Sequence, residues 1–202
     1  MAGRSLGSGG DVIAALYVQK GGVYFGLDGV DPWDEARDAR LYAGPYPVVA
    51  HPPCARWCRL AKLVESRGGK AVGDDGGTFA AALASVRAWG GILEHPAWSL
   101  AWGVHGLTAP HAFGWALTTD GGWVCEVSQA AYGHRAPKAT WLYYVGAAPP
   151  PPLNWARPPC AVITTSAPRG QKRVEYMHKA ERSRTPIVFR DLLLSMAAAS
   201  RA

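Results

Sequence analysis

The chain has 202 residues, of which 49% are hydrophobic and 18% are charged, and its net charge is +6. Four cysteines are too few for a disulfide framework at this length, which excludes a small disulfide-stapled protein. The apolar run VIAALYV has about a third of the length of a membrane span. We therefore expect a cytoplasmic globular domain without a membrane segment, and the positive charge is compatible with a polyanionic partner.

The first elements alternate between apolar and polar patterns. Residues 1–10 form a flexible start, and DVIAALYV is typical of a buried strand. The stretch DPWDEARDARLYAG predicts a helix, with Asp31 as its N-cap and Pro32 at its first position.

The middle of the chain continues this alternation. PVVAH predicts a second buried strand, and CARWCRLAKLVES has the period of a helix that begins at Cys54. TFAAALASVRAW predicts another helix, capped by Thr78. GILEHP then repeats the earlier design, in which an apolar strand ends in polar residues and a proline.

The last third contains two further strand patterns, a proline run and a helix. GGWVCEVSQAAYGH and TWLYYVG predict the strands, APPPPLNWARPPC a stiff linker, and TPIVFRDLLLSMAAA the helix. Because strands alternate with helices, we expect an α/β fold with a right-handed, mostly parallel sheet and flanking helices.

The same features predict the organisation of the chain. We expect an α/β catalytic domain over residues 11–147 and a proline-rich linker over 148–160. A basic segment follows over 161–202, and we expect its terminal helix to pack on the domain.

Chemically useful side chains stand where two predicted strands end. Cys54 follows a double proline at the predicted start of a helix, where backbone N–H groups lower the pKa of a thiol. Glu94 ends a buried strand, where burial raises the pKa of a carboxyl group and suits it to donate a proton. Alternatively, Cys54 is a small buried residue of the hydrophobic core, and Glu94 is a carboxylate that forms an ion pair with Arg56 or Arg59.

Three motifs, in this order, resemble those of the DNA cytosine-5 methyltransferases. They are PPC after one apolar strand, EHP after the next, and YGHRAPKATWLYYVG. The likeness is closest to short methyltransferase-like proteins of phages and prophages, and it extends over about residues 48–190, including ERSRTP. The resemblance implies a reduced Rossmann-like, methyltransferase-like fold in a phage-infected or prophage-carrying bacterial cell.

The resemblance also implies roles for individual residues. Cys54 would attack C6 of a pyrimidine so that C5 becomes nucleophilic, and Glu94 would contact N3 and the exocyclic amino group. Lys138 would hold the ring oxygen or a nearby phosphate. Further candidates for substrate binding are His51, Pro53, His95, Tyr132 and Arg135. The implied substrate is a cytosine flipped out of DNA, and a free pyrimidine nucleotide is the alternative.

The methyl donor is the point at which the sequence departs from the family. The family binds S-adenosylmethionine with an FxGxG loop after its first strand, and no such loop follows VIAALYV. S-adenosylmethionine is still a candidate cofactor, but its binding residues are unknown, and another one-carbon donor is an alternative. A non-catalytic relative that binds nucleic acid and has lost the donor site is the alternative from another functional class.

Lysine and arginine residues are dense in PRGQKRVEYMHKAERSR near the C-terminus. This segment predicts contacts with the phosphates of DNA, and the alternative is a solvated face. The candidate residues are Arg169, Lys172, Arg173, Lys179, Arg182 and Arg184.

Two other patterns have weaker functional interpretations. His51, Cys54 and Cys58 could begin a zinc site completed by His95 or Cys125, but the chain lacks a CxxC pair and we expect no metal. Among nine tryptophans we expect one or two beside a ligand, where they would stack on a base. The candidates for stacking are Trp57, Trp98, Trp102 and Trp123.

Overall fold

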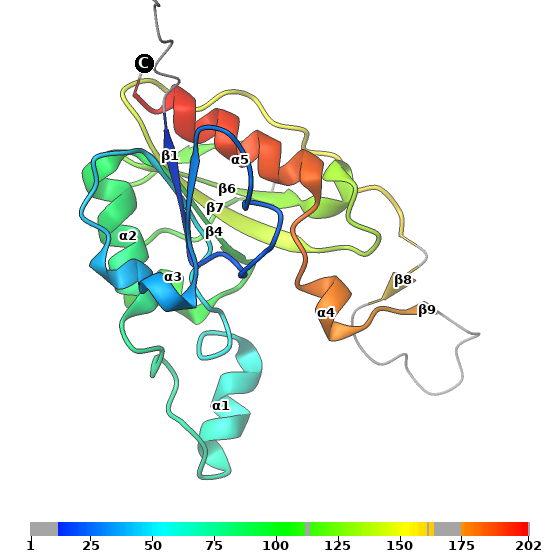
Figure 1. The fold of residues 1–202 in the computed structure, drawn as a ribbon. Coiled ribbons are helices and arrows are strands. Elements are labelled where there is room, and N and C mark those ends of the chain that lie inside the picture. Colours follow the sequence, from blue (N-terminus) through cyan, green and yellow to red (C-terminus); the bar gives the residue numbers. More distant parts are fainter. Residues whose placement is uncertain (1–11, 112–113, 161, 164–174, 202) are drawn as a thin grey trace, which may run out of the picture.

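The computed structural model describes residues 12–111, 114–160, 162–163 and 175–201 (Figure 1). The predicted flexible start and the candidates Arg169, Lys172 and Arg173 lie outside the described residues. Seven strands form one sheet, and two more form a separate pair. The strands are β1 (Ile13–Leu16), β2 (Val30–Trp33), β3 (Val48–Ala50), β4 (Gly91–Pro96), β5 (Ala116–Leu117), β6 (Trp123–Ser128), β7 (Ala139–Val145), β8 (Val162–Ile163) and β9 (Glu175–Tyr176). The α-helices are α1 (Arg59–Ser66), α2 (Thr78–Trp89), α3 (Leu100–Val104), α4 (Lys179–Arg182) and α5 (Ile187–Ala199).

The large sheet has the order β2-β1-β3-β4-β7-β6-β5. Its first four strands are parallel, whereas β7 runs antiparallel to both β4 and β6, and β5 runs antiparallel to β6. The α/β fold is confirmed, and β6 runs in the same direction as the first four strands because β4 and β6 are both antiparallel to β7, so the predicted mostly parallel sheet fails only at β7 and β5. The physical reason is the short connection over residues 129–138, because a parallel neighbour needs a longer crossover, usually through a helix.

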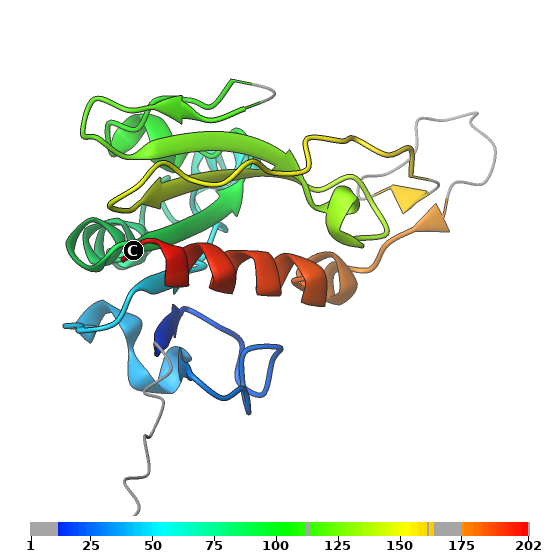
Figure 2. The same ribbon diagram turned by 90° about the horizontal axis from the view of Figure 1, so that it is seen from above.

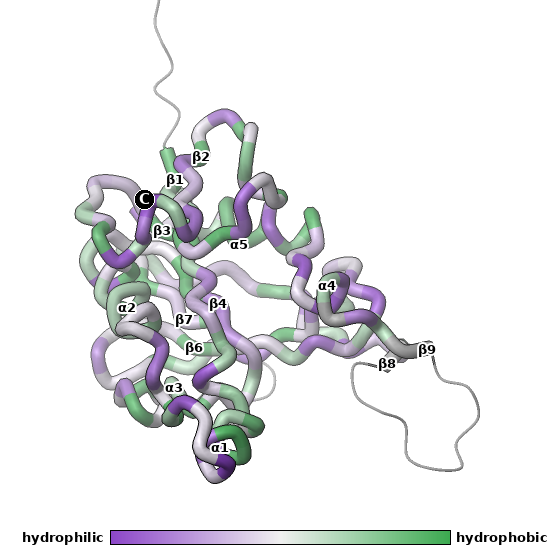
Figure 3. The backbone as a smooth tube through the Cα atoms, turned by 60° about the horizontal axis from the view of Figure 1, so that its bottom comes forward, coloured by the Kyte–Doolittle hydropathy of each residue, from purple (hydrophilic) through white to green (hydrophobic). Residues whose placement is uncertain are grey.

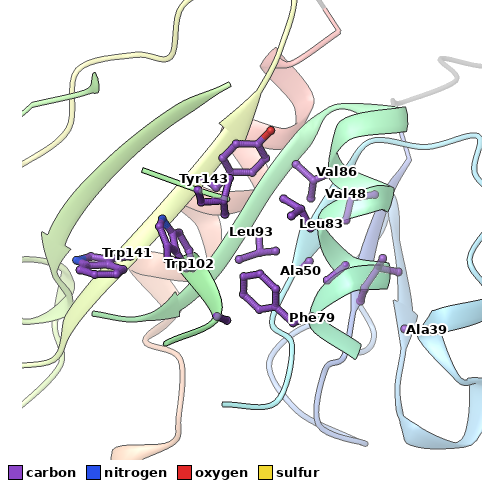
Figure 4. Packing of buried hydrophobic residues seen from close by; sticks show 14 of the residues in the cluster. Ala39, Val48, Ala50, Phe79, Leu83, Val86, Leu93, Trp102, Trp141 and Tyr143 are labelled. Carbon is purple, nitrogen blue, oxygen red and sulfur yellow. The ribbon is translucent and has the colours of Figure 1, made fainter. Parts of the chain in front are cut away.

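Helices cover the two faces of this sheet (Figure 2). On one face, Phe79, Leu83 and Val86 of α2 pack with alternate strand residues such as Val48 and Leu93 (Figure 4). Because successive strand residues point to opposite faces, their neighbours Val49 and Ile92 join the other cluster. There the apolar stripe of α5, made of Phe189, Leu193 and Met196, packs on the sheet, so the predicted terminal helix is confirmed.

The helix predicted from DPWDEARDARLYAG is wrong. Its first residues form the edge strand β2, where Pro32 is tolerated because one side of an edge strand needs no ladder partner. The carboxylate of Asp34 then accepts hydrogen bonds from the backbone N–H groups of Ala36 and Arg37, and Asp38 takes a left-handed conformation with φ 47°. These local bonds compete with a continuous helix, and only the short 3₁₀ helices Glu35–Arg37 and Ala39–Leu41 form.

Helix α2 lies where the sequence predicts it, but Thr78 is its first residue rather than its cap. The carboxylate of Asp75 accepts hydrogen bonds from the backbone N–H of Phe79 at 2.9 Å and from the Thr78 hydroxyl at 3.0 Å. It also accepts from the indole N–H of Trp57 at 2.8 Å. An ionised carboxylate accepts several such bonds more strongly than a hydroxyl does, which explains the change of cap.

Helix α1 projects from the rest of the fold (Figures 1 and 3). Leu60, Leu63 and Val64 are exposed on it. None of the described helices is long and apolar enough to cross a membrane.

Candidate functional site

The carboxyl ends of β3 and β4 lie at the same edge of the sheet because the two strands are parallel. Ligands of open α/β sheets bind at this edge, outside the carboxyl ends of the strands. Here the segments that follow the two strands enclose a pocket of about 130 Å³. It is lined by Cys54, Trp57, Cys58, His95, Pro96, Ala97, Trp98 and Ser99. The structure therefore brings together the PPC and EHP motifs, as the sequence predicts.

Two tryptophans form walls of this pocket. Trp57 is buried, and its backbone carbonyl accepts a hydrogen bond from the N–H of Leu100 at 2.9 Å, which joins the two pocket segments. Trp98 is 54% exposed and takes a left-handed backbone conformation with φ 62°. Such a conformation is strained for a bulky residue and concentrates at ligand sites. The other two stacking candidates lie elsewhere, Trp102 in the core below and Trp123 paired with Tyr144 at the far end of β7.

His95 contributes a neutral polar group to the pocket. The side chain is fully buried, with its ring stacked on Trp102 and edge-on to Phe79. Burial lowers the pKa of His95 to about 4, although the charge of Glu94 and the carbonyl of Pro53 oppose this shift. Neither ring nitrogen makes a hydrogen bond of normal geometry within the described part of the chain. A neutral imidazole of this kind offers one donor and one acceptor to a ligand.

Glu94 projects from the opposite side of β4 to His95 and is not one of the residues that line the pocket, but it stands at the same end of the strand, close enough for its charge to raise the pKa of Cys54. Its carboxylate accepts hydrogen bonds from His51 Nδ1 at 3.0 Å and from Gln129 Nε2 at 3.1 Å. Burial alone would raise the pKa of Glu94, but the bond from His51 and the charge of Lys138 outweigh it and lower the pKa to about 2. The expected raised pKa is therefore wrong, and Glu94 is a carboxylate at neutral pH.

These contacts extend into a buried chain of hydrogen bonds. The Tyr24 hydroxyl lies 2.8 Å from His51 Nε2, and Gln129 Nε2 lies 3.0 Å from the hydroxyl of Thr140. Sequence reasoning missed Tyr24, Gln129 and Thr140 as site residues. The available signal was weak: Gln129 and Thr140 are polar residues at the ends of apolar strand patterns, and Tyr24 stands in a glycine-rich stretch.

Cys54 is exposed, but its thiol does not have the properties that we predicted. Helix α1 begins only at Arg59, and the carbonyl of Cys54 instead accepts from the N–H of Trp57 in a preceding turn. Without a helix N-terminus, desolvation raises the pKa of Cys54, and the charges of Glu94 and Cys58 raise it further, against a smaller effect of Lys138. The expected low pKa is therefore wrong, and the thiol is protonated at neutral pH.

The rate of alkylation at different pH values shows whether the pKa of the Cys54 thiol is raised or lowered. Because only the thiolate reacts, we expect iodoacetamide to modify Cys54 slowly at pH 7 and about tenfold faster for each pH unit up to pH 9. Glu94→Gln removes a charge that raises the pKa and should accelerate the reaction at pH 8, whereas Lys138→Met should slow it. Trypsin separates Cys54 from Cys58 by cleaving after Arg56, so mass spectrometry can follow each thiol. A rate that is constant between pH 7 and pH 9 would contradict this expectation.

Of the other predicted site residues, Lys138 lies near Glu94 and Cys54, whereas Tyr132 and Arg135 have structural contacts elsewhere. Lys138 precedes β7, whose start lies beside the end of β4, and its charge acts on both Glu94 and Cys54. Tyr132 is buried, and its hydroxyl accepts from the N–H of Asn154 at 2.9 Å, so it belongs to the core. Arg135 forms an ion pair with Glu181 at 2.6 Å.

Three of the phosphate-contact candidates lie in the described part of the basic segment. Lys179 and Arg182 are the first and last residues of α4, and Arg184 is exposed just beyond it.

The described residues contain no group of three or more His, Cys, Asp and Glu side chains that could hold a metal ion. Cys125 is buried in the core on the α5 side of the sheet, and His51 Nδ1 is bonded to Glu94. The zinc alternative therefore gains no support from these residues.

The segment after β1 does not fit S-adenosylmethionine. Tyr17 takes a left-handed conformation there, and the side chain of Tyr24 is buried with its hydroxyl 2.8 Å from His51 Nε2. Asp31, an acidic group that could bind a ribose, is bonded to Arg37 and to the indole N–H of Trp33.

Comparisons with family models, curated proteins and solved structures gave no match.

Proposed function

We propose that this chain is a reduced Rossmann-like, methyltransferase-like enzyme that modifies a pyrimidine base at C5, with Cys54 as the nucleophile. One observation carries the proposal: an exposed thiol lines a small pocket between two tryptophans at the carboxyl ends of parallel strands. Flat aromatic walls suit a planar ring. The motifs that resemble DNA cytosine-5 methyltransferases supply the same nucleophile.

The chemistry begins when Cys54 loses its proton and its sulfur forms a bond to C6 of the ring. The electron pair of the C5–C6 double bond then moves onto C5 and the adjoining ring atoms. C5 takes up an electrophile and gives up its own proton to a base, after which the double bond forms again and the C–S bond breaks. The thiolate is regenerated, so the cysteine acts as a covalent catalyst.

The charged groups near Cys54 have complementary roles in this proposal. Lys138 favours the thiolate, and its charge would stabilise electrons that move onto the ring oxygen. Glu94, as a carboxylate, can accept hydrogen bonds from an amino group or a ring N–H. The substrate is a cytosine flipped out of DNA, with a free pyrimidine nucleotide as the competing substrate. The donor of the one-carbon group is not S-adenosylmethionine held in the usual loop, because the residues after β1 do not fit it.

Hydrogen exchange at C5 tests the proposal without a donor. In D₂O, the electrophile is a deuteron, so we expect the protein to replace the C5 hydrogen of cytosine in DNA, or of dCMP or dUMP, by deuterium. The rate should rise with pH between 7 and 9, since the pKa of Cys54 is raised and the thiolate fraction grows. Mass spectrometry of the recovered bases measures the exchange.

A non-catalytic nucleic-acid-binding relative is the second candidate, and the protonated thiol of Cys54 favours it. This candidate predicts DNA binding without C5 exchange at any pH between 7 and 9. Exchange above the rate without protein would contradict it.

A further inference from the structure

The hydrogen bonds around Glu94 join five segments that are distant in the sequence. Tyr24 follows β1, His51 follows β3, Glu94 is in β4, Gln129 follows β6, and Thr140 is in β7. All but His51 are at most 9% exposed. Buried polar side chains are costly unless they are bonded, and a connected network fixes the orientation of its members.

The chemistry of the side chains gives this chain a direction. A carboxylate only accepts hydrogen bonds, so His51 Nδ1 carries the hydrogen that faces Glu94. In the neutral ring, Nε2 then accepts from the Tyr24 hydroxyl, and this bond fixes the tautomer. Without the Tyr24 bond, the ring could turn or change tautomer and lose its donor to Glu94.

On the other side, the amide nitrogen of Gln129 donates to both Glu94 and Thr140. The Oε1 atom of Gln129 is buried and has no hydrogen-bond partner in the described part of the chain. The two oxygens of a carboxylate have about four acceptor sites, of which His51 and Gln129 use two. Glu94 and Gln129 together therefore retain acceptors for N–H donors of a ligand.

We propose that His51, held by Tyr24, is a positioning residue that keeps Glu94 oriented as a hydrogen-bond acceptor for the base at Cys54. This inference rests on the proposed function. The inference adds to the proposed function a role for two residues, His51 and Tyr24, that do not need to touch the reacting atoms. The other groups that act on Glu94 are Lys138, His95 and Gln129, and the substitutions of His51 leave all three residues in the sequence.

The first measurement is the titration of Glu94 in the protein without substrate. The chain has six glutamates, so carboxyl ¹³C NMR with labelled glutamate is simple to assign through Glu94→Gln. We expect Glu94 to titrate near pH 2 in the parent. In His51→Leu its pKa should rise by at least about one pH unit. His51→Asn places an amide donor where Nδ1 stands and should keep the pKa below about 3.

The second measurement is C5 exchange with the same variants. We expect His51→Leu to lower kcat by about a hundredfold, with KM within about threefold, and His51→Asn to recover most of the loss. Tyr24→Phe removes the hydroxyl that fixes the tautomer of the neutral ring, so it should lower the exchange rate between pH 7 and pH 9 in the same direction by less. His111→Leu, at an exposed position, serves as the matched control.

The two readouts separate the two proposals. An unchanged Glu94 pKa in His51→Leu overturns the inference, whatever the exchange rate. If His51→Leu does not fold, an unchanged Glu94 pKa in His51→Ala has the same meaning. Absence of exchange in the parent, with the expected change in Glu94 titration, overturns the proposed function and leaves the positioning of Glu94 supported.

Discussion

Replacing Cys54 by serine should abolish C5 exchange, whereas the same change at Cys58 should leave most of it. Both thiols line the pocket, but Cys58 Sγ contacts the carbonyl of Ala55 at 3.5 Å, while Cys54 is exposed. A serine hydroxyl is a far weaker nucleophile than a thiolate, so the exchange rate should fall by roughly a thousandfold or more, to the background. The fold should survive, since the substitution changes the volume very little.

The adduct itself gives an independent measurement. A 5-fluoropyrimidine has no C5 hydrogen to release, so with a suitable donor the covalent complex accumulates on Cys54 and mass spectrometry can locate it. Thermal unfolding of Cys54→Ser and Cys58→Ser should occur within a few degrees of the parent. Exchange that survives in Cys54→Ser would rule out Cys54 as the nucleophile, and equal loss in Cys58→Ser would contradict the expected difference between the two thiols.

Gly91→Ala should cost more stability than any of the substitutions above. Gly91 begins β4 with φ +115°, a conformation that L side chains rarely adopt, and an added Cβ would overlap the carbonyl oxygen of Val48 in β3. This overlap involves the backbone of two paired strands in the centre of the sheet, which cannot move apart without loss of the ladder. We expect a loss of about 4 kcal/mol or more in the free energy of unfolding.

Gly106→Ala is the matched control for this prediction. Gly106 also has a positive φ, but nothing lies within 4 Å of an added Cβ. Its substitution should therefore cost only the left-handed conformation, about 1–2 kcal/mol. Urea unfolding of both variants measures the difference. If the two variants lose equal stability, the clash with Val48 does not contribute.

The parts of the fold that could be predicted are those governed by local pattern. Apolar runs predicted β1, β3 and β4, and helical periodicity predicted α2 and α5, because their burial depends on the spacing of their own residues. The same reasoning failed over residues 31–41, where Asp34 and Asp38 bond to nearby backbone groups and interrupt the helix. The direction of β7 depends on the length of a connection and was not visible in the strand itself.

The candidate site could likewise be predicted where it depends on local pattern, but not where it depends on residues distant in the sequence. Strand ends placed the PPC motif and His95 around one pocket, as expected from the parallel order of β3 and β4. The pKa values of Cys54 and Glu94 are both shifted opposite to the prediction. The shift at Glu94 depends on His51 and Lys138, which reach it from segments beside other strands, and the shift at Cys54 depends on its burial and on where α1 begins. Partners so distant along the chain leave no periodic signal.

The carboxylate of Asp75 has a consequence for how the pocket loses its shape. It anchors the indole of Trp57 and also the first turn of α2, so we expect one wall of the pocket and the start of this helix to unfold together. Burial opposes ionisation of Asp75, but these hydrogen bonds outweigh it and lower its pKa below 3.8. The stabilisation is therefore complete at neutral pH and is lost as the pH falls through that lowered value. Only acid strong enough to protonate Asp75 should therefore loosen this wall of the pocket and the start of α2, and it should loosen both in the same transition.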